Sequence, residues 1–291
     1  MAFENVRSIL RIGSPFSSFK LLLITASRSR PRYRDLCIRL LRPFTSGGEV
    51  SLRYRCYDQY LRCFIGLSDL DSDLTSVLEL SVRDTYNLDF SFQPDLVIDG
   101  GGNIGLFTLR AAAGVAAIGD SPVNFVVCEP LPRNLGQIRK HLAINNVSAE
   151  IMAGCLGGER RSIPFYCRGA LDSSFDPDKP YTSVVEIPVY TLQDAIGSHP
   201  AKRILIKLDI EGMEIEVLGS YVPSEHRPVY IVGELHRFAT NAPTLRRTFE
   251  DNGWAFEFCE VANDHATFRA CSPSALPLLA SMASVGRPAR D

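Results

Sequence analysis

The chain has 291 residues, of which 45% are hydrophobic and 22% are charged, and its formal net charge is −2. This length suits one full-sized α/β core with a modest appendage better than two equal domains. The apolar runs are far shorter than the roughly 20 residues that a membrane-spanning helix needs, no secretory signal pattern is recognisable, and the eight cysteines form no CxxC pair. We therefore expect a cytoplasmic protein without a transmembrane segment, a disulfide framework or a zinc site.

Residues 1–48 form a basic segment, with nine Lys and Arg residues against two acidic ones. Two helical stretches are predicted within residues 5–42, and a polar linker follows at 45–48. The arginines do not form a clean amphipathic face, so we expect this extension to dock on the acidic body or to join two copies in a homodimer. A basic segment could also bind nucleic acid or an anionic membrane surface, but this alternative is less favoured. We therefore expect no nucleic-acid partner.

Residues 49–90 are predicted to form a lead-in hairpin and a helix. Two segments, 50–57 and 60–66, alternate apolar and polar residues as strands do, and residues 71–84 have helical spacing behind an Asp-Ser-Asp start. From Asp95 onward, apolar runs alternate with helical stretches. This pattern predicts a doubly covered α/β sheet that is mostly parallel.

A glycine-rich turn follows the first of these apolar runs. Gly100, Gly102 and Gly105 form a GxGxxG directly after a predicted strand and at the start of a predicted helix. Glycines there allow a tight turn and a close approach to a cofactor, and the helix presents unpaired N–H groups to it. Asp99 would repel a pyrophosphate but suits a cofactor with an ammonium and a sulfonium, which favours S-adenosylmethionine over a nicotinamide dinucleotide.

Glu129 ends the second strand of this series, 24 residues beyond Gly105. An acidic side chain at that position can accept hydrogen bonds from both ribose hydroxyls of an adenosine cofactor. Pro130 stiffens the turn that follows. Residues 155–200 then form an insertion that contains a polar loop, and we expect it to act as a lid over the site, with the loop at 168–183 above the acceptor. Cys155, at the start of the insertion, is included among the predicted cofactor contacts.

The strand at 203–209 places Lys207 and Asp209 on one face, with Asp209 at the carboxyl end, where open α/β sheets bind ligands. Lys207 interrupts an otherwise apolar run and must be paired with a nearby acid, for which the possible partners are Asp99, Glu211, Glu214 and Glu234. A structural ion pair and a catalytic role are equally plausible interpretations of this lysine.

Glu234 and His236 end the next strand on its same face. Transfer of a methyl group to a hydroxyl requires a base near the attacking oxygen, and His236, Glu211 and Asp209 are the positioned candidates. The same side chains with Glu234 could instead ligate Mg²⁺, although a metal is not expected. The last two strands, at 255–261 and 265–272, are predicted to form an antiparallel hairpin that closes the sheet, and the tail 272–291 is predicted to fray.

With these residues in place, the sequence resembles the FkbM family of methyltransferases. The resemblance is carried by VIDGGGNIG, by CEPLPRN and by IKLDIEGMEIEVL, and it runs from about Asp95 to His236. Ser173 and Ser174 in the insertion are also similar to a serine-containing stretch of the family. Gly101 departs from the family, in which a larger small residue is commoner at that position.

The resemblance implies the class I methyltransferase fold, with seven strands and an antiparallel last strand, and O-methylation of a hydroxyl on a sugar, a lipid or a secondary metabolite. It implies that the cofactor is held by Asp99, Gly100, Gly102, Asn103, Gly105 and Glu129, and that Asp209 and Glu211 lie beside the transferred methyl group. Gly101 and Asp209 are also included among the predicted cofactor contacts. Two alternatives from other classes are an NAD-dependent sugar oxidoreductase and a non-catalytic cofactor-binding module.

Overall fold

The computed structural model describes residues 43, 45–67, 70–80, 85–119, 121–167, 180–197, 199–222, 225–279 and 282. The two predicted N-terminal helices, almost all of the predicted lid loop at 168–183 and the end of the tail lie outside the described residues. Ser173 and Ser174 lie outside them as well. The domain boundaries at residues 48 and 271 stay predictions.

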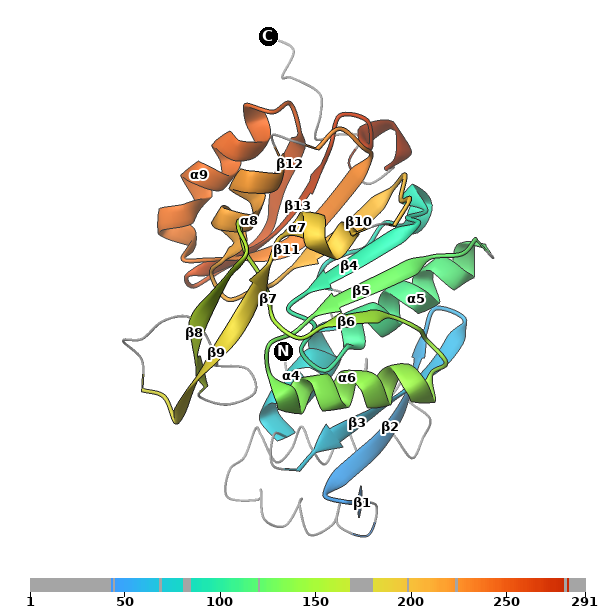
Figure 1. The fold of residues 1–291 in the computed structure, drawn as a ribbon. Coiled ribbons are helices and arrows are strands. Elements are labelled where there is room, and N and C mark those ends of the chain that lie inside the picture. Colours follow the sequence, from blue (N-terminus) through green and yellow to red (C-terminus); the bar gives the residue numbers. More distant parts are fainter. Residues whose placement is uncertain are drawn as a thin grey trace.

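The body is built on one sheet of seven strands in the order β12-β13-β11-β10-β4-β5-β6 (Figure 1). The five strands from β11 to β6 run parallel, and β13 is antiparallel to both of its neighbours. This arrangement confirms the predicted class I methyltransferase fold with its antiparallel last strand. The strands are β4 (Leu96–Gly100), β5 (Asn124–Cys128), β6 (Glu150–Met152), β10 (Ile204–Leu208), β11 (Val229–His236), β12 (Ala255–Ala262) and β13 (His265–Cys271).

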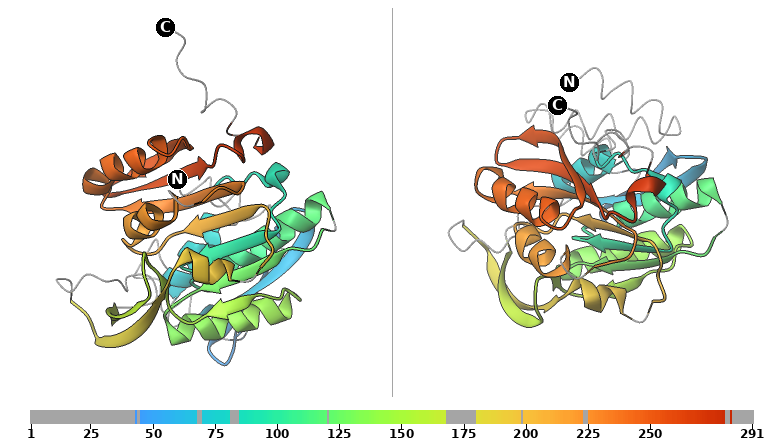
Figure 2. Two further views of the ribbon diagram at one scale, coloured as in Figure 1. Left: turned by 45° about the horizontal axis from the view of Figure 1, so that its top comes forward. Right: turned by 90° about the horizontal axis from the view of Figure 1, so that it is seen from above.

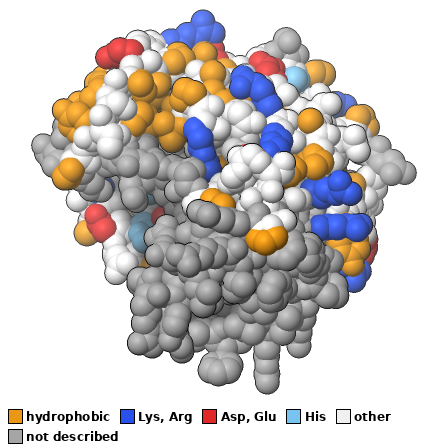
Figure 3. All heavy atoms as spheres, turned by 90° about the horizontal axis from the view of Figure 1, so that it is seen from below, with side chains coloured by type: hydrophobic (Ala, Val, Ile, Leu, Met, Phe, Trp, Pro, Cys, Tyr) orange, Lys and Arg blue, Asp and Glu red, His pale blue; other side chains and the backbone are white. Residues whose placement is uncertain are grey.

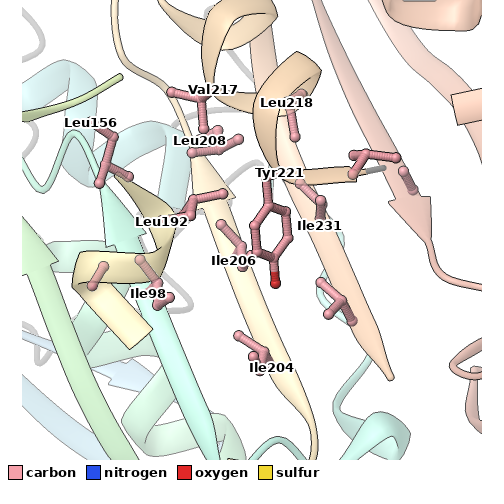
Figure 4. Close-up of a cluster of buried hydrophobic side chains, with 14 of the residues drawn as sticks. Ile98, Leu156, Leu192, Ile204, Ile206, Leu208, Val217, Leu218, Tyr221 and Ile231 are labelled. Carbon is pink, nitrogen blue, oxygen red and sulfur yellow. The ribbon is translucent and has the colours of Figure 1, made fainter. Parts of the chain in front are cut away.

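Alternate side chains of the central strands enter two separate cores, because successive residues of a strand point to opposite faces. Ile98, Ile206 and Ile231 belong to the core beneath α7 (Leu192–Ile196), α8 (Glu214–Tyr221) and α9 (Phe238–Glu250), part of which is drawn in Figure 4. The opposite face packs against α5 (Leu106–Ile118) and α6 (Pro132–Ile144). Lys207 on β10 and Glu234 and His236 on β11 occupy the alternate positions, so they lie on that second face of the sheet.

The lead-in segment consists of β1 (Thr45–Ser46), the hairpin β2 (Glu49–Cys56) and β3 (Gln59–Gly66), and helix α4 (Leu70–Leu78). Side chains from the end of α6 and from α4 satisfy the outer edge of β3. The backbone N–H groups of Arg62 and Phe64 donate to Asn145 Oδ1 and His141 Nε2 at the end of α6, and that of Gly66 donates to Asp73 Oδ2 of α4, each at 2.8 Å. An edge strand capped in this way cannot pair with another chain. The hairpin is thereby fastened along α6. The α-helix ends at Leu78, before the predicted end at 84, and residues 81–84 lie outside the described part.

The insertion forms a small separate sheet in the order β7-β9-β8, from β7 (Cys155–Leu156), β8 (Arg161–Cys167) and β9 (Ser183–Tyr190). Its β8–β9 hairpin stands out from one side of the body in Figure 2. The base of the insertion is tied to α8, where Arg161 Nη1 and Nη2 donate to the Glu216 carboxylate at 2.5 and 2.7 Å. The short helices η4 (Phe90–Phe92) and η6 (Leu276–Leu278) complete the described elements.

The described residues can be compared with the expectations about a transmembrane segment, the cysteines and the basic side chains. No helix in the described ranges combines the length and the apolar character that crossing a bilayer requires. The seven described cysteines are free thiols. On the face shown in Figure 3, Lys and Arg side chains stand in several separate places on the described surface rather than in one patch.

Candidate active site

The glycine turn between β4 and α5 is pressed against two neighbouring strands. The N–H groups of Gly101 and Gly102 donate to Cys128 O at 3.0 and 2.9 Å. A Cβ on Gly101, which has φ +77°, would lie 1.8 Å from Asp209 O, and one on Gly102 would lie 2.3 Å from Val127 Cγ1. We expected these glycines to allow close approach of a ligand. The structure gives a different reason for the two glycines, because the backbone and side chains of β5 and of the turn after β10 already fill the space.

The carboxylate of Glu129 fixes this turn by accepting hydrogen bonds from it and from the start of α6. Its Oε2 accepts from the backbone N–H of Asn103 at 2.8 Å, and its Oε1 accepts from Leu131 N at 2.9 Å and from Asn134 Nδ2 at 3.2 Å. Burial raises the pKa of Glu129 to about 7, against the opposing effect of these donors. Its predicted contact with a ribose stays a prediction, as do those of Pro130 and Cys155. What the geometry does show is that Glu129 holds Asn103 at φ +46°.

Asp99 and Lys207 form a buried ion pair under the turn. Asp99 is completely buried, its Oδ2 accepts from Thr108 Oγ1 at 2.7 Å, and its Oδ1 lies 3.3 Å from Lys207 Nζ. Lys207 Nζ also donates to Gly101 O at 2.5 Å. Burial alone would lower the pKa of Lys207, but the charges of Asp99 and Asp209 raise it. The charge of Asp99 is therefore offset inside the protein, which corrects the argument that this charge selects the cofactor.

A cavity opens between the glycine turn, the end of β10 and the segment that follows α4. Of the predicted cofactor residues, Gly101, Gly102, Asn103 and Asp209 line it, and of the predicted catalytic residues, Lys207, Asp209 and Glu234 do. Four other predicted cofactor residues near the turn do not line the cavity, namely Asp99, Gly100, Gly105 and Glu129. The remaining lining residues are Ser76, Glu79, Leu80, Thr85, Tyr86, Ile104, Leu106 and Phe107. None of the lining residues comes from the described part of the insertion, so its role as a lid stays a prediction.

Asp209 presents two differently engaged oxygens at this cavity. Its Oδ2 accepts from the Tyr86 hydroxyl at 3.1 Å and lies 4.0 Å from Lys207 Nζ. Among the described residues, its Oδ1 has no hydrogen-bond partner, and the side chain is 32% exposed. One oxygen is therefore fixed by the protein and the other is available to a ligand.

The turn after Asp209 is held by Glu214, a residue that the sequence offered only as a possible partner of Lys207. The Glu214 side chain is completely buried, and its Oε1 accepts from Ile210 N at 3.2 Å and from Gly212 N at 3.1 Å. The same oxygen lies 3.0 Å from His236 Nδ1. Glu211 sits between these residues in the left-handed region, with φ +57°, a strained conformation that the surrounding contacts must sustain.

His236 lies among acidic side chains. Its Nε2 is 3.6 Å from Glu211 Oε2 and 4.0 Å from Glu234 Oε1. Burial would lower the pKa of His236, but the hydrogen bond and charge of Glu214, with the charges of Asp209 and Glu211, raise it to about 10. At neutral pH the ring is then an imidazolium without a free lone pair, which weighs against its predicted role as a base. Burial raises the pKa of Glu211 and of Glu234 to about 7.

The acidic side chains around Asp209 also bear on the predicted metal alternative. In the part of the chain that the structure describes, no group of three or more His, Cys, Asp or Glu side chains has an arrangement that could hold a metal ion. The alternative assignment of Asp209, Glu211, Glu234 and His236 as Mg²⁺ ligands stays a prediction.

The lead-in segment supplies the side of the cavity that sequence reasoning missed. Ser76 accepts from Asn103 Nδ2 at 2.8 Å, and Tyr86 reaches Asp209 across 123 positions of the chain. Motif spacing carries no signal for contacts over such distances. The EGME segment did contain a signal for Glu214, since a glutamate at the first position of a helix can reach back to the N–H groups that precede it.

A seven-stranded sheet of this order, with a glycine turn and an acidic rim at one cavity, defines a class I methyltransferase. Residues 99–256 match the family model described as the methyltransferase FkbM domain, which is more than half of the chain. The chain therefore belongs to the FkbM methyltransferase family, and S-adenosylmethionine is its methyl donor.

Individual relatives are more distant. The chain is 29% identical over 185 residues to "Methyltransferase 1" of Beauveria bassiana, which covers 55% of this chain and 72% of that protein. The crystal structure of methyltransferase FkbM from Methylobacillus flagellatus has 14% identity and a TM-score of 0.46, covering 92% of this chain and 58% of that one. TYW2 of M. jannaschii in complex with AdoMet has 12% identity and a TM-score of 0.42, covering 78% and 86%. The chain thus spans less than two thirds of the M. flagellatus protein, and the family assignment rests on residues 99–256.

The cavity fits the methyl donor in two respects. Asn103 Oδ1 is shielded from solvent and has no hydrogen-bond partner among the described residues, so it can accept from an ammonium or a hydroxyl group of the cofactor. The carboxylates of Asp209 and Glu234 line the same cavity, and their negative charge suits a sulfonium.

Proposed function

We propose that this methyltransferase transfers its methyl group to a hydroxyl of a small molecule, such as a sugar, a lipid or a secondary metabolite. The observation that carries the proposal is the free Oδ1 of Asp209, which lies at a cavity shared with the glycine turn. A hydroxyl becomes a good nucleophile only when a nearby acceptor takes its proton. Asp209 provides that acceptor without any rearrangement of the described residues.

The glycine turn would hold the cofactor through Gly101, Gly102 and Asn103. S-adenosylmethionine, when bound, supplies an electrophilic methyl group on a positive sulfur. Asn103 is already fixed for this task, because its N–H donates to Glu129 and its side-chain amide to Ser76. Its remaining acceptor, Oδ1, would take a hydrogen bond from the cofactor.

Asp209 is our candidate for the base, and Glu211 and Glu234 are the alternatives. The Asp209 side chain is oriented by the hydrogen bond from Tyr86 to Oδ2 and by the charge of Lys207, 4.0 Å from the same oxygen, so its Oδ1 can take the hydroxyl proton. Glu211 and Glu234 are partly protonated near neutral pH because burial raises the pKa of each to about 7. His236 as an imidazolium would stabilise the negative charge of Glu211, from which its Nε2 lies 3.6 Å.

Positioning would account for most of the rate enhancement. Alignment of oxygen, methyl and sulfur contributes several kcal/mol to barrier lowering in reactions of this kind. Two buried clamps secure the two sides of the cavity, with Glu129 on the glycine turn and Glu214 on the turn after β10. Phe107 and Leu106, which are buried beside the cavity, restrict the access of water.

The test replaces Asp209 with asparagine, which keeps the size of the side chain and removes its charge. Methyl transfer from labelled S-adenosylmethionine is measured against a panel of paired hydroxyl and amine compounds, and S-adenosylhomocysteine affinity is measured by calorimetry. We expect wild-type protein to methylate hydroxyl members, and Asp209→Asn to lower kcat by about 100-fold or more while the affinity changes less than about threefold. Asp251→Asn, on the exposed end of α9, is the matched control and should change neither quantity. Unchanged turnover in Asp209→Asn, or methylation of amines alone, would contradict the proposal.

A further inference from the structure

We infer that Tyr86 is a positioning residue for the transfer reaction, which holds one oxygen of Asp209 so that the other is presented to the acceptor. This inference rests on the proposed role of Asp209 as the base. It assigns a part in the reaction to a residue outside the segment that matches the family, since that match begins at Asp99.

The first observation is the contact itself. The Tyr86 hydroxyl donates to Asp209 Oδ2 at 3.1 Å, and Lys207 Nζ lies 4.0 Å from the same oxygen. Lys207 is committed to Asp99 and to Gly101 O, at 3.3 and 2.5 Å. Tyr86 is therefore the one hydrogen-bond donor to the Asp209 carboxylate among the described residues. Without its hydroxyl, the carboxylate could rotate and offer either oxygen.

The second observation is that the Tyr86 ring cannot move away easily. Tyr86 is 8% exposed, and its ring packs edge-on against Phe107, with the ring centroids 5.8 Å apart. Phe107 is 1% exposed and belongs to the first turn of α5, directly after the glycine turn. The same ring contact therefore ties the position of Tyr86 to the part of the fold that would hold the cofactor.

The protonation of Tyr86 suits a fixed donor. Burial raises the pKa of its hydroxyl well above the ordinary value, and the charges of Asp209, Glu234 and Glu79 raise it further. Tyr86 thus keeps its proton at neutral pH, and it donates to Asp209 without competing for the acceptor proton.

A purely structural role is the alternative that the test must separate. Tyr86 belongs to the core that contains Val97, Phe107 and Tyr230, and a phenylalanine would fill the same space. Tyr86→Phe therefore removes the hydroxyl and keeps the packing. Tyr60→Phe is the control, because Tyr60 is 53% exposed, lies on β3 and does not line the cavity.

The experiment uses the full chain labelled with carbon-13 at the ζ position of its ten tyrosines. The signal that disappears in Tyr86→Phe belongs to Tyr86. We expect this signal to titrate above the ordinary tyrosine pKa of about 10 in the wild type, to move at neutral pH in Asp209→Asn, and to be unaffected in Asp251→Asn. With an acceptor from the panel, Tyr86→Phe should lower kcat by about tenfold, as expected for the loss of one hydrogen bond to a charged group, while the acceptor KM and the S-adenosylhomocysteine affinity change less than about threefold.

Two results would overturn the inference. A Tyr86 signal that is insensitive to Asp209→Asn removes the contact on which it rests, and this readout does not depend on turnover. A Tyr86→Phe variant with wild-type kcat, in a protein whose Asp209→Asn variant is inactive, refutes the positioning role and leaves the proposed function standing. If Asp209→Asn retains full turnover, the proposed function fails, and the inference about positioning fails with it.

Discussion

The pKa of His236 gives the sharpest test of how the acidic rim is built. The ring nitrogen Nδ1 lies 3.0 Å from the completely buried Glu214 carboxylate, and the pKa of His236 is raised to about 10 from an ordinary 6.5. Each pKa unit corresponds to about 1.4 kcal/mol, so the imidazolium is favoured by ~5 kcal/mol at most. The ring is 24% exposed, and solvent screening reduces this contribution to ~2–3 kcal/mol.

The perturbation is Glu214→Gln, which keeps an oxygen for the N–H groups of Ile210 and Gly212 and removes the negative charge. Carbon-13 NMR of the five histidines would follow the Cε1–H signal of His236 between pH 5 and 11. We expect a pKa near 10 in the wild type and a decrease of about two units or more in Glu214→Gln, because the largest favourable partner has lost its charge. Glu216→Gln, two residues further along α8 and paired with Arg161, is the control and should leave the titration unchanged. A wild-type His236 that titrates near 6.5, or a Glu214→Gln variant with an unaltered pKa, would refute the reasoning.

The same shift predicts how stability depends on pH. A histidine whose folded pKa is raised contributes its full stabilisation below the unfolded value of 6.5, and the contribution is lost as the pH rises through about 10. The raised pKa values of Glu129, Glu211 and Glu234 act in a lower window, because stability falls while these groups lose their protons between about 4.5 and 7. The free energy of unfolding should therefore decrease from pH 5 to pH 10. In His236→Gln, the decrease above pH 7 should be smaller.

Three further predictions concern the buried ion pair, the packing of the glycine turn and the binding of the ligand. Lys207→Met should lower the free energy of unfolding by about 3–5 kcal/mol, because it leaves Asp99 as a buried unpaired charge. Urea titration should show that the double variant with Asp99→Asn regains part of this free energy. An equal loss of stability in the single and the double variant would contradict the ion pair. Gly101→Ala should destabilise the protein by about 2 kcal/mol or more, since its Cβ would lie 1.8 Å from Asp209 O. Gly136→Ala, in open space on α6, should instead stabilise by about 0.5–1 kcal/mol, and a similar effect of the two glycine variants in thermal unfolding would count against the close packing of the turn. S-adenosylhomocysteine at 100 times its Kd should stabilise the wild type by about 2.7 kcal/mol, and no shift in Tm would argue against binding to the folded chain.

The sequence predicted the sheet well because each of its strands is a short local pattern. The runs at 204–208 and 229–235 are apolar on both faces except at Lys207 and Glu234, and such runs between helices are typical of a covered parallel sheet. The glycine turn and the end of β10 could be placed at one edge for the same reason, as the carboxyl ends of parallel strands meet there.

The parts of the site that escaped prediction depend on contacts between distant residues. The sequence offers Asp99 as one of four possible partners of Lys207, but the choice among them and the hydrogen bond from Thr108 depend on the three-dimensional packing. The pKa of His236 depends on Glu214, a neighbour across two elements. Tyr86 lies in a segment without a motif, and only the folded hairpin and helix of the lead-in bring it to Asp209.

The most direct test of the central claim is a crystal structure of the protein with S-adenosylhomocysteine. The account predicts that the amino acid end of the ligand contacts Gly101 and Asn103, that Asn103 Oδ1 accepts a hydrogen bond from it, and that the sulfur faces the cavity beside Asp209 Oδ1. A ligand bound elsewhere, or a sulfur on the side of the cavity away from Asp209, would contradict the account.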